Sequence, residues 1–254
     1  MLLAIDVGNT QTVIGLFDDS DLVDHWRIVT VAERTSDELA LLLHQFISWH
    51  QLDPRSEVTG MAISSVVPRV TASLREMADR HFSVEPCIIE PGVRTGMPIL
   101  YENPKEVGAD RIANAVAAYE LYGGPSIVVD FGTATTLDAV SAKGEYLGGA
   151  IIPGIEVSMD ALFGRTAGLR KVELVPPKHV IGKSTVESIQ SGAINGFTGQ
   201  VDHLVRCFEA EMGPSTVIAT GGLASLITPL SATIVHEEPW LTLYGLRIVY
   251  QRNR

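Results

Sequence analysis

The alternation of apolar and polar residues predicts three β-strands at the start of the chain. Residues 2–5 and 12–17 are mainly apolar and flank a turn of small and polar residues, which is the pattern of a β-hairpin. Residues 22–29 mix apolar and polar positions, as on a sheet face that is only partly covered. We therefore expect these three runs to form a meander.

A helix, a strand, a second helix and a short strand are expected next. Thr35 and Glu38 have the spacing of a capping box, and apolar residues recur at helical spacing from Leu39 to Ile47. Residues 60–67 form a buried strand that leads into a helix at Pro68, and residues 87–89 form another short strand. The segment that follows is rich in Pro and Gly, and we expect it to be largely loop.

The second half of the chain repeats this order. A helix around residues 112–117 is broken by Gly123-Gly124-Pro125, so we place the boundary between two domains there, at 1–120 and 121–254. The elements expected in the second domain are a hairpin of two strands within 126–140, a strand at 146–152, a helix through Leu162, a helix at about 186–207, a strand from 216, a strand near Ile234 and a helix from about Trp240.

The turn of the first hairpin has a composition suited to binding phosphate. Gly8 carries no side chain that would keep a ligand away, while Asn9, Thr10 and Thr12 offer amide and hydroxyl donors. The carboxylate of Asp6 would repel a bound phosphate, so the two could lie close together only with a cation between them. On these residues alone, an ordinary hairpin in which Asp6 and Asn9 hydrogen-bond their own backbone explains the pattern equally well.

A second copy of this hairpin favours the functional interpretation. Residues 126–140 repeat the order of apolar strand, Asp130, one apolar residue, Gly132, a turn rich in hydroxyl groups and a second strand. Two such hairpins resemble the nucleotide site of the actin-like kinase superfamily. The resemblance implies an α/β fold of two ribonuclease-H-like domains in tandem, with mixed five-stranded sheets flanked by helices and a nucleotide cleft between the domains.

Composition and charge narrow the class of protein. The chain has 254 residues, of which 46% are hydrophobic, so it can bury a proper core. Its net charge of -11 and lack of a basic cluster argue against a nucleic acid partner. Cys87 and Cys207 are too few for a disulfide framework, and we expect both to be core thiols in a reducing, cytoplasmic compartment. The sequence shows neither a signal segment nor an apolar run long enough to span a membrane, so we expect neither export nor membrane contact.

Residues 108–111 place a carboxylate beside a guanidinium at the start of a helix. Asp110 is readily explained as a cap of the first turn and Arg111 as its surface neighbour, if this helix is considered by itself.

A further glycine pair, Gly221-Gly222, ends a strand and would let the chain pass close to a nucleotide base or ribose. No GxGxxG pattern occurs, so the usual dinucleotide-binding fingerprint is missing.

Taken together, these segments resemble the type III pantothenate kinases in order and spacing. The matching set comprises residues 6–10, 108–111, 130–133, 148–154 and 221–222, and it covers nearly the whole chain. The family phosphorylates pantothenate with ATP in the first step of coenzyme A biosynthesis. The resemblance therefore implies a phosphotransferase that uses ATP with Mg²⁺.

The resemblance also implies roles for single residues. Asp110 is expected to be the catalytic base, Asp130 the ligand of a monovalent cation (K⁺ or NH₄⁺), and Asp6 the residue that holds Mg²⁺ through the nucleotide. The residues expected to bind ATP are Asp6, Val7, Gly8, Asn9, Thr10, Gln11, Thr12, Val13 and Thr133. Those expected to bind pantothenate are Tyr101, Gly108, Ala109, Asp110, Arg111 and Thr185; a helix N-cap is the plain alternative for Thr185.

Two other functions compete with this one. A kinase of the same fold for another alcohol, such as a sugar, is disfavoured by the pairing of Asp110 with Arg111. A non-catalytic regulator that keeps only the nucleotide site is disfavoured because it would not need Asp6, Asp110 and Asp130 together. A homodimer without nucleic acid or membrane partners is expected from the resemblance.

Overall fold

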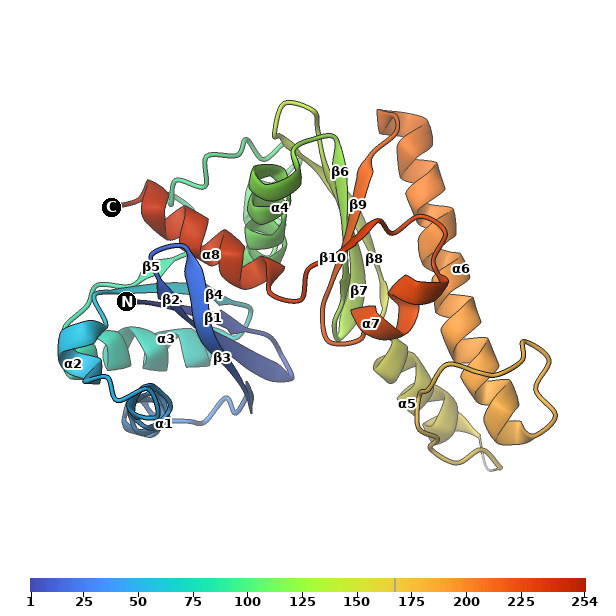
Figure 1. The fold of residues 1–254 in the computed structure, drawn as a ribbon, viewed down its shortest axis with the longest axis horizontal. Helices are drawn as coiled ribbons and strands as arrows, with labels where there is room; N and C mark the ends of the chain where they lie inside the picture. The colour runs from blue at the N-terminus through green and yellow to red at the C-terminus, as the bar shows by residue number, and fades with distance from the viewer. Residues whose placement is uncertain (167) are drawn as a thin grey trace. The chain divides into compact units, whose positions relative to one another are not determined.

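The computed structural model describes residues 1–166 and 168–254. The chain divides into two compact units, residues 1–117 with 241–254 and residues 118–240, and each unit is built on one five-stranded sheet. Figure 1 shows helices lying against both sheets. The predicted α/β fold with two mixed five-stranded sheets flanked by helices is confirmed.

The first unit has the sheet order β3-β2-β1-β4-β5. Its strands are β1 (Leu2–Val7), β2 (Gln11–Asp18), β3 (Asp21–Val29), β4 (Gly60–Ser65) and β5 (Cys87–Ile88). Its helices are α1 (Ser36–Ser48), α2 (Pro54–Glu57), α3 (Pro68–Met77), the first part of α4 (Ala109–Tyr122) and α8 (Leu241–Arg252). β1 is antiparallel to β2 and parallel to β4, so the sheet is mixed.

The central strand β1 is buried on both faces. Leu3, Ile5 and Val7 point into a core formed with α1 and α3, whereas the opposite face is covered by α8, which contacts β1 and β4. The capping box predicted for α1 is present: Glu38 N–H donates to Thr35 Oγ1 (3.3 Å), and Thr35 N–H donates to Glu38 Oε2 (2.8 Å). The sequence pattern thus sets both the start of α1 and the face that it buries.

The second unit repeats this topology with the sheet order β10-β9-β6-β7-β8. Its strands are β6 (Ser126–Phe131), β7 (Ala134–Val140), β8 (Tyr146–Pro153), β9 (Thr216–Thr220) and β10 (His236–Glu237). Its helices are α5 (Ile155–Arg165), α6 (Thr185–Met212) and α7 (Ala224–Ile227). All three helices contribute side chains to the core on one face of the sheet, around Ile127, Val129 and Phe131 of the central strand β6.

The structure differs from the sequence prediction in several places, and three elements and one cysteine are the clearest. Helix α6 extends to Met212 rather than to residue 207, and β10 begins at His236, two residues after Ile234. Helix α8 belongs to the first unit rather than the second, because its apolar face packs on β1 and β4. Cys207 is exposed on α6, so the prediction that both cysteines are core thiols is wrong for this residue; Cys87 is partly buried.

Among the described residues, no helix is long and apolar enough to cross a membrane.

Asp202 links α6 to the segment that precedes β10. Its side chain is 7% exposed and accepts hydrogen bonds from Ser231 Oγ (2.6 Å), Thr233 Oγ1 (2.8 Å) and Ala232 N–H (3.0 Å). Burial by itself raises the pKa of the Asp202 carboxyl, but these hydrogen bonds outweigh burial and hold the pKa below its usual value. The ionised form therefore stabilises the folded state.

We expect Asp202→Asn to destabilise the protein by about 1–3 kcal/mol at neutral pH, because an amide cannot accept all three hydrogen bonds. Since the folded pKa lies below the unfolded one, the stabilisation is complete above about pH 5 and is lost as the pH falls through the folded pKa. Urea unfolding of wild type and variant between neutral pH and about pH 3 checks this.

Asp160→Asn is the control for this comparison, since Asp160 forms only an exposed ion pair with Lys171. Its cost should stay below about 0.5 kcal/mol at every pH. An Asp202→Asn variant that matches this control at neutral pH would contradict the prediction.

Candidate functional site

Asp6 lies at the carboxyl end of β1, next to a buried hydroxyl group on the neighbouring parallel strand. Asp6 and Ser64 share the same register between β1 and β4, and Ser64 Oγ donates a hydrogen bond of 2.8 Å to Asp6 Oδ1. Ser64 is completely buried, whereas Asp6 is partly exposed. The hydrogen bond favours the ionised carboxylate and fixes its orientation at the start of the turn.

The turn after Asp6 is held in place by Thr30, the residue that follows β3. Thr30 Oγ1 donates to Gly8 O (2.8 Å), and Thr30 N–H donates to Thr10 O (3.0 Å). Thr30 Oγ1 also lies 2.9 Å from the buried Thr12 Oγ1. The hydroxyl of Thr12 is therefore used within the turn, and the exposed residues of this predicted loop are Asn9, Thr10 and Gln11.

The other predicted members of this loop, Val7, Gly8 and Val13, have no side chain exposed on the turn, so these residues can offer only backbone groups to a ligand. Val7 is 1% exposed and points into the core, and Val13 pairs with Asp6 across the hairpin. Gly8 does not adopt a positive φ; a side chain there would instead approach Gln11 O to 3.1 Å, and Gly8 N–H donates to the same oxygen. This approach is tighter than most Cβ contacts, so glycine suits the position because of packing and not because of an unusual backbone angle.

Asp110 and Arg111 form the first turn of α4. Asp110 Oδ1 accepts a hydrogen bond from Arg111 N–H (2.8 Å), so the carboxylate does satisfy one free N–H group of the helix start. Its other oxygen, Oδ2, makes no hydrogen bond within the described part of the chain. Arg111 is only 8% exposed, which rules out the alternative of a surface neighbour. A buried guanidinium keeps its charge and favours an anionic group beside it.

Gly108 and Ala109 precede this pair. A side chain at Gly108 would meet Asp110 Oδ1 at 2.4 Å, so the glycine leaves room for the carboxylate. Tyr101 lies upstream in a loop that ends in a short 3₁₀ turn at Pro104–Glu106, and it is partly exposed. Residues 91–108 are largely irregular, as predicted from their Pro and Gly content.

Asp130 of the second unit occupies a position that corresponds to Asp6. It is the next-to-last residue of the central strand β6, and its register partner on the parallel strand β9 is the buried hydroxyl residue Thr220. Gly221 follows with φ of +92°, and a Cβ there would lie 2.5 Å from Asp130 Oδ1 and 2.6 Å from Phe131 N. Only glycine lets this backbone pass so close to the carboxylate.

Two backbone oxygens of the turn that follows Asp130 lie close to Gly154. Gly154 N–H donates to Thr133 O (3.1 Å), and a Cβ on Gly154 would lie 2.3 Å from that oxygen and 2.5 Å from Gly132 O. A carboxylate with neighbouring carbonyls is an all-oxygen donor set, which suits a hard cation. In the described residues no cluster of three or more His, Cys, Asp or Glu side chains has the arrangement of a metal site.

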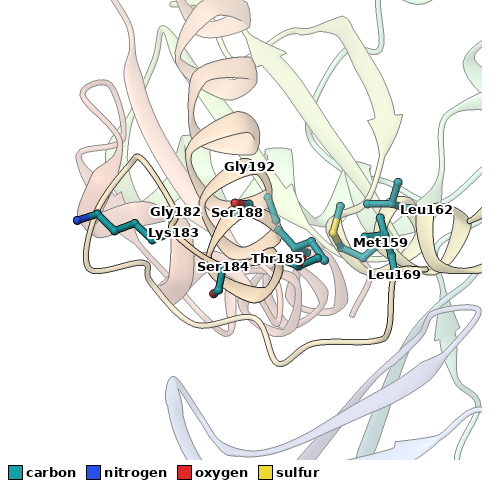
Figure 2. Close-up of a pocket in the computed structure, with 11 residues that line it drawn as sticks. Met159, Leu162, Leu169, Gly182, Lys183, Ser184, Thr185, Ser188 and Gly192 are labelled. Carbon is teal, nitrogen blue, oxygen red and sulfur yellow. The ribbon is translucent and has the colours of Figure 1, made fainter.

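Thr185 lies in a separate cavity of the second unit. The cavity has a volume of about 730 Å³ and is lined by residues of α5, of α6 and of the chain between them. Figure 2 shows Thr185 between Ser188 and Met159, whereas the Lys183 side chain extends away from the apolar wall of Met159 and Leu162. Ser184 is the N-cap of α6, so the alternative assignment of Thr185 as the N-cap is wrong.

Sequence reasoning missed the residues that hold the site in place. Ser64 and Thr30 were not recognised, because each acts from a strand or strand end remote in sequence from the residue it supports. The position of Thr220 beside Asp130 in the sheet was not recognised either. The available signal was weak: it is a polar residue at or next to the last position of a mainly apolar strand, as for Asp6, Ser64, Asp130 and Thr220.

The chain was compared with families of known proteins. The family model described as type III pantothenate kinase matches residues 2–207. A type III pantothenate kinase of Streptomyces avermitilis is 58% identical over all of this chain and 98% of its own length. Those of Moorella thermoacetica and Myxococcus xanthus are 56% and 55% identical and are covered over 100% and 99% of their lengths.

Solved structures with lower identity share the fold. A Campylobacter jejuni protein described as a Baf family transcriptional activator has a TM-score of 0.63 at 18% identity, with 99% of this chain and 98% of that chain covered. The ROK hexokinase of Thermus thermophilus has a TM-score of 0.52 at 14% identity, with 99% and 98% covered. At these identities the likeness shows the architecture alone.

The packing around Gly221 generates a stability prediction. Gly221→Ala should destabilise the second unit by about 1–3 kcal/mol, because the added methyl group meets Asp130 and the Phe131 backbone and φ is positive. This corresponds to a fall of several degrees in the thermal midpoint, at about 2–4 °C per kcal/mol. Gly199→Ala is the matched control, since nothing lies within 4 Å of its added Cβ. Equal midpoints for the two variants would contradict the assigned role of Gly221.

Proposed function

The chain belongs to the type III pantothenate kinase family, and from this premise we propose how its residues transfer the γ-phosphoryl group of ATP to pantothenate. The product is phosphopantothenate, and the reaction is the first step of coenzyme A biosynthesis. The observation that carries this function is the start of α4, where a carboxylate with one oxygen left available lies beside a buried guanidinium.

Asp110 is proposed as the general base. Phosphoryl transfer has a loose transition state, so the alcohol of pantothenate loses its proton late and needs a well-placed acceptor more than a strong one. The bond from Arg111 N–H to Oδ1 fixes the carboxylate, and Oδ2 remains to accept the proton. The tight fit of Gly108 against Oδ1 supports the same orientation.

Arg111 is proposed to bind pantothenate together with the polar groups around it. A guanidinium recognises a carboxylate in bidentate fashion, and pantothenate carries one. Because Arg111 is buried, an anion beside it offsets the cost of removing its charge from water. Gly108, Ala109 and Tyr101 are proposed as the other substrate contacts of the first unit, and Thr185 as a contact contributed from its cavity in the second.

The hairpin turn from Asp6 to Val13 is proposed to bind the phosphates of ATP, and Thr133 to contact the nucleotide. The exposed backbone and side chains of Asn9, Thr10 and Gln11 supply donors, while Thr30 keeps the turn in shape. Asp6, oriented by Ser64, would anchor the Mg²⁺ that accompanies ATP. That ion neutralises negative charge on the phosphate oxygens.

Asp130 is proposed to hold a monovalent cation together with backbone carbonyls of its turn. Residues 126–140, the hairpin that carries Asp130, contain no Lys or Arg, so an ion is the proposed source of positive charge within this turn. The carbonyl oxygens of Gly132 and Thr133 lie in the same turn, packed against Gly154. We also propose that the enzyme acts in the cytoplasm and is a homodimer, as the family resemblance implies.

The function is tested by measuring ADP release with Mg²⁺, K⁺ and either pantothenate or glucose. We expect release to depend on pantothenate, with phosphopantothenate detected by mass spectrometry. Asp110→Asn, which keeps the shape of the side chain and removes the base, should lower kcat by roughly 10²-fold or more and leave ATP binding nearly unchanged. Equal rates with glucose would contradict the assignment, and normal turnover of Asp110→Asn would reduce Asp110 to a helix cap.

The role of Asp130 is tested with chloride salts at constant ionic strength. K⁺ and NH₄⁺ should activate the wild type, whereas Na⁺ and Li⁺, which differ in size, should do so poorly. Asp130→Asn should lose this selectivity along with most of the activity, because a neutral amide no longer balances the charge of the ion. Full activity of the wild type in sodium alone would show that Asp130 holds no selective cation.

A further inference from the structure

Every substrate residue proposed for the first unit lies within residues 94–114, and the start of this segment is held by the end of the chain. The Asn253 side chain forms a two-bond pair with the backbone of Arg94: Arg94 N–H donates to Oδ1 (3.0 Å), and Nδ2 donates to Arg94 O (2.9 Å). Nδ2 also donates to Val249 O (2.8 Å) in α8. The amide of Asn253 thus joins the loop to the helix.

Arg252 makes a second contact with the same loop. Its Nη1 donates a short hydrogen bond to Thr95 O. Gly96 adopts a φ of +71°, and a Cβ there would lie 2.7 Å from Arg252 Nη1, so the guanidinium packs directly on this turn. Tyr101 follows five residues after Gly96.

The other end of the segment is held by the first turns of α8. Thr242 Oγ1 donates a 2.7 Å hydrogen bond to Oδ1 of Asn114, which is completely buried and lies one turn after Asp110 in α4. The two helix backbones touch at this point, because a Cβ on Gly245 would lie 2.0 Å from Ala113 O. Rotation or sliding of α4 would break both contacts.

We propose that α8, together with Asn253 that follows it, acts as a frame for the pantothenate-binding segment. The frame sets the position of this segment at both of its ends, at Arg94 and at Asn114. Asn253 and Thr242 are positioning residues in this inference: neither contacts the substrate, and each acts through the segment that it holds. The inference rests on the proposed function. The part of the chain that matches the family model ends at residue 207, before α8.

The contact at the start of the pantothenate-binding segment, between Asn253 and Arg94, is tested with Asn253→Ala. Loss of the two bonds to Arg94 should raise KM for pantothenate about 3- to 10-fold, while kcat and KM for ATP stay within about twofold of wild type. Hydrogen exchange should show a faster Arg94 amide. Arg254→Ala, which removes only a ring contact with Tyr250, is the control and should leave all of these values unchanged.

The contact at the other end of the segment, between Thr242 and Asn114, is tested with a pair of variants at Thr242. Thr242→Val keeps the shape and removes the hydroxyl, so Asn114 loses its donor and the start of α4 loosens; we expect kcat to fall about 3- to 10-fold. Thr242→Ser retains the hydroxyl and should stay within about twofold of wild type. Thermal unfolding of each variant is measured in parallel.

The outcomes separate this inference from the proposed function. If wild-type enzyme releases no ADP in response to pantothenate, the proposed function fails, and the inference fails with it. If the wild type is active but Asn253→Ala and Thr242→Val show normal constants, the inference alone is overturned. It is equally overturned if both variants raise KM for ATP and for pantothenate by the same factor, or if Thr242→Ser is as impaired as Thr242→Val, because those results indicate general loss of structure.

Discussion

A carboxylate at the end of a buried central strand is the constraint on which both halves of this chain depend. β1 and β6 are the middle strands of their sheets, and Asp6 and Asp130 lie near their carboxyl ends. A charge at such a place is costly unless hydrogen bonds or a counter-ion compensate it. In the first unit Ser64 supplies a hydrogen bond from the register position beside Asp6; in the second, Thr220 occupies the equivalent position beside Asp130. The cations proposed for the two carboxylates would lie at these strand ends, where the fold has already set the direction of each side chain.

Close backbone approach is the second shared feature of these turns. Gly154 packs on the carbonyl oxygens of Gly132 and Thr133, and Gly221 packs on Asp130 and Phe131. Each of these glycines lies where a methyl group would collide with backbone atoms, which side-chain rotation cannot relieve. The motif glycines are therefore explained by packing around the carboxylate and its turn, and the turn's oxygens stay in a fixed arrangement as a result.

Features set by short-range pattern were predictable from the sequence, and features set by long-range contacts were not. The hairpins, the capping box of α1 and the loop at residues 91–108 follow from local spacing, and the structure confirms them. The family resemblance supplied Asp110 and Arg111, but the burial of Arg111 is visible only once α4 is packed. Thr30 and Ser64 act across 22 and 58 residues of sequence, and no local pattern indicates such partners. The return of α8 to the first unit was missed for the same reason, since its apolar face does not say which sheet it covers.

The irregular backbone of residues 91–108 explains why the end of the chain matters to the substrate segment. A loop has few hydrogen-bond partners of its own, so its position is defined only if other parts of the molecule supply donors and acceptors. The tail of α8 provides these for Arg94 and Thr95, and the body of α8 fixes Asn114 at the far end. A segment proposed to bind a small polar substrate would gain from this arrangement, because the ordering of its backbone is secured by another part of the chain. The proposed catalytic carboxylate of Asp110 then needs little local rigidity of its own beyond the bond from Arg111 N–H, since the helix that carries it is already held.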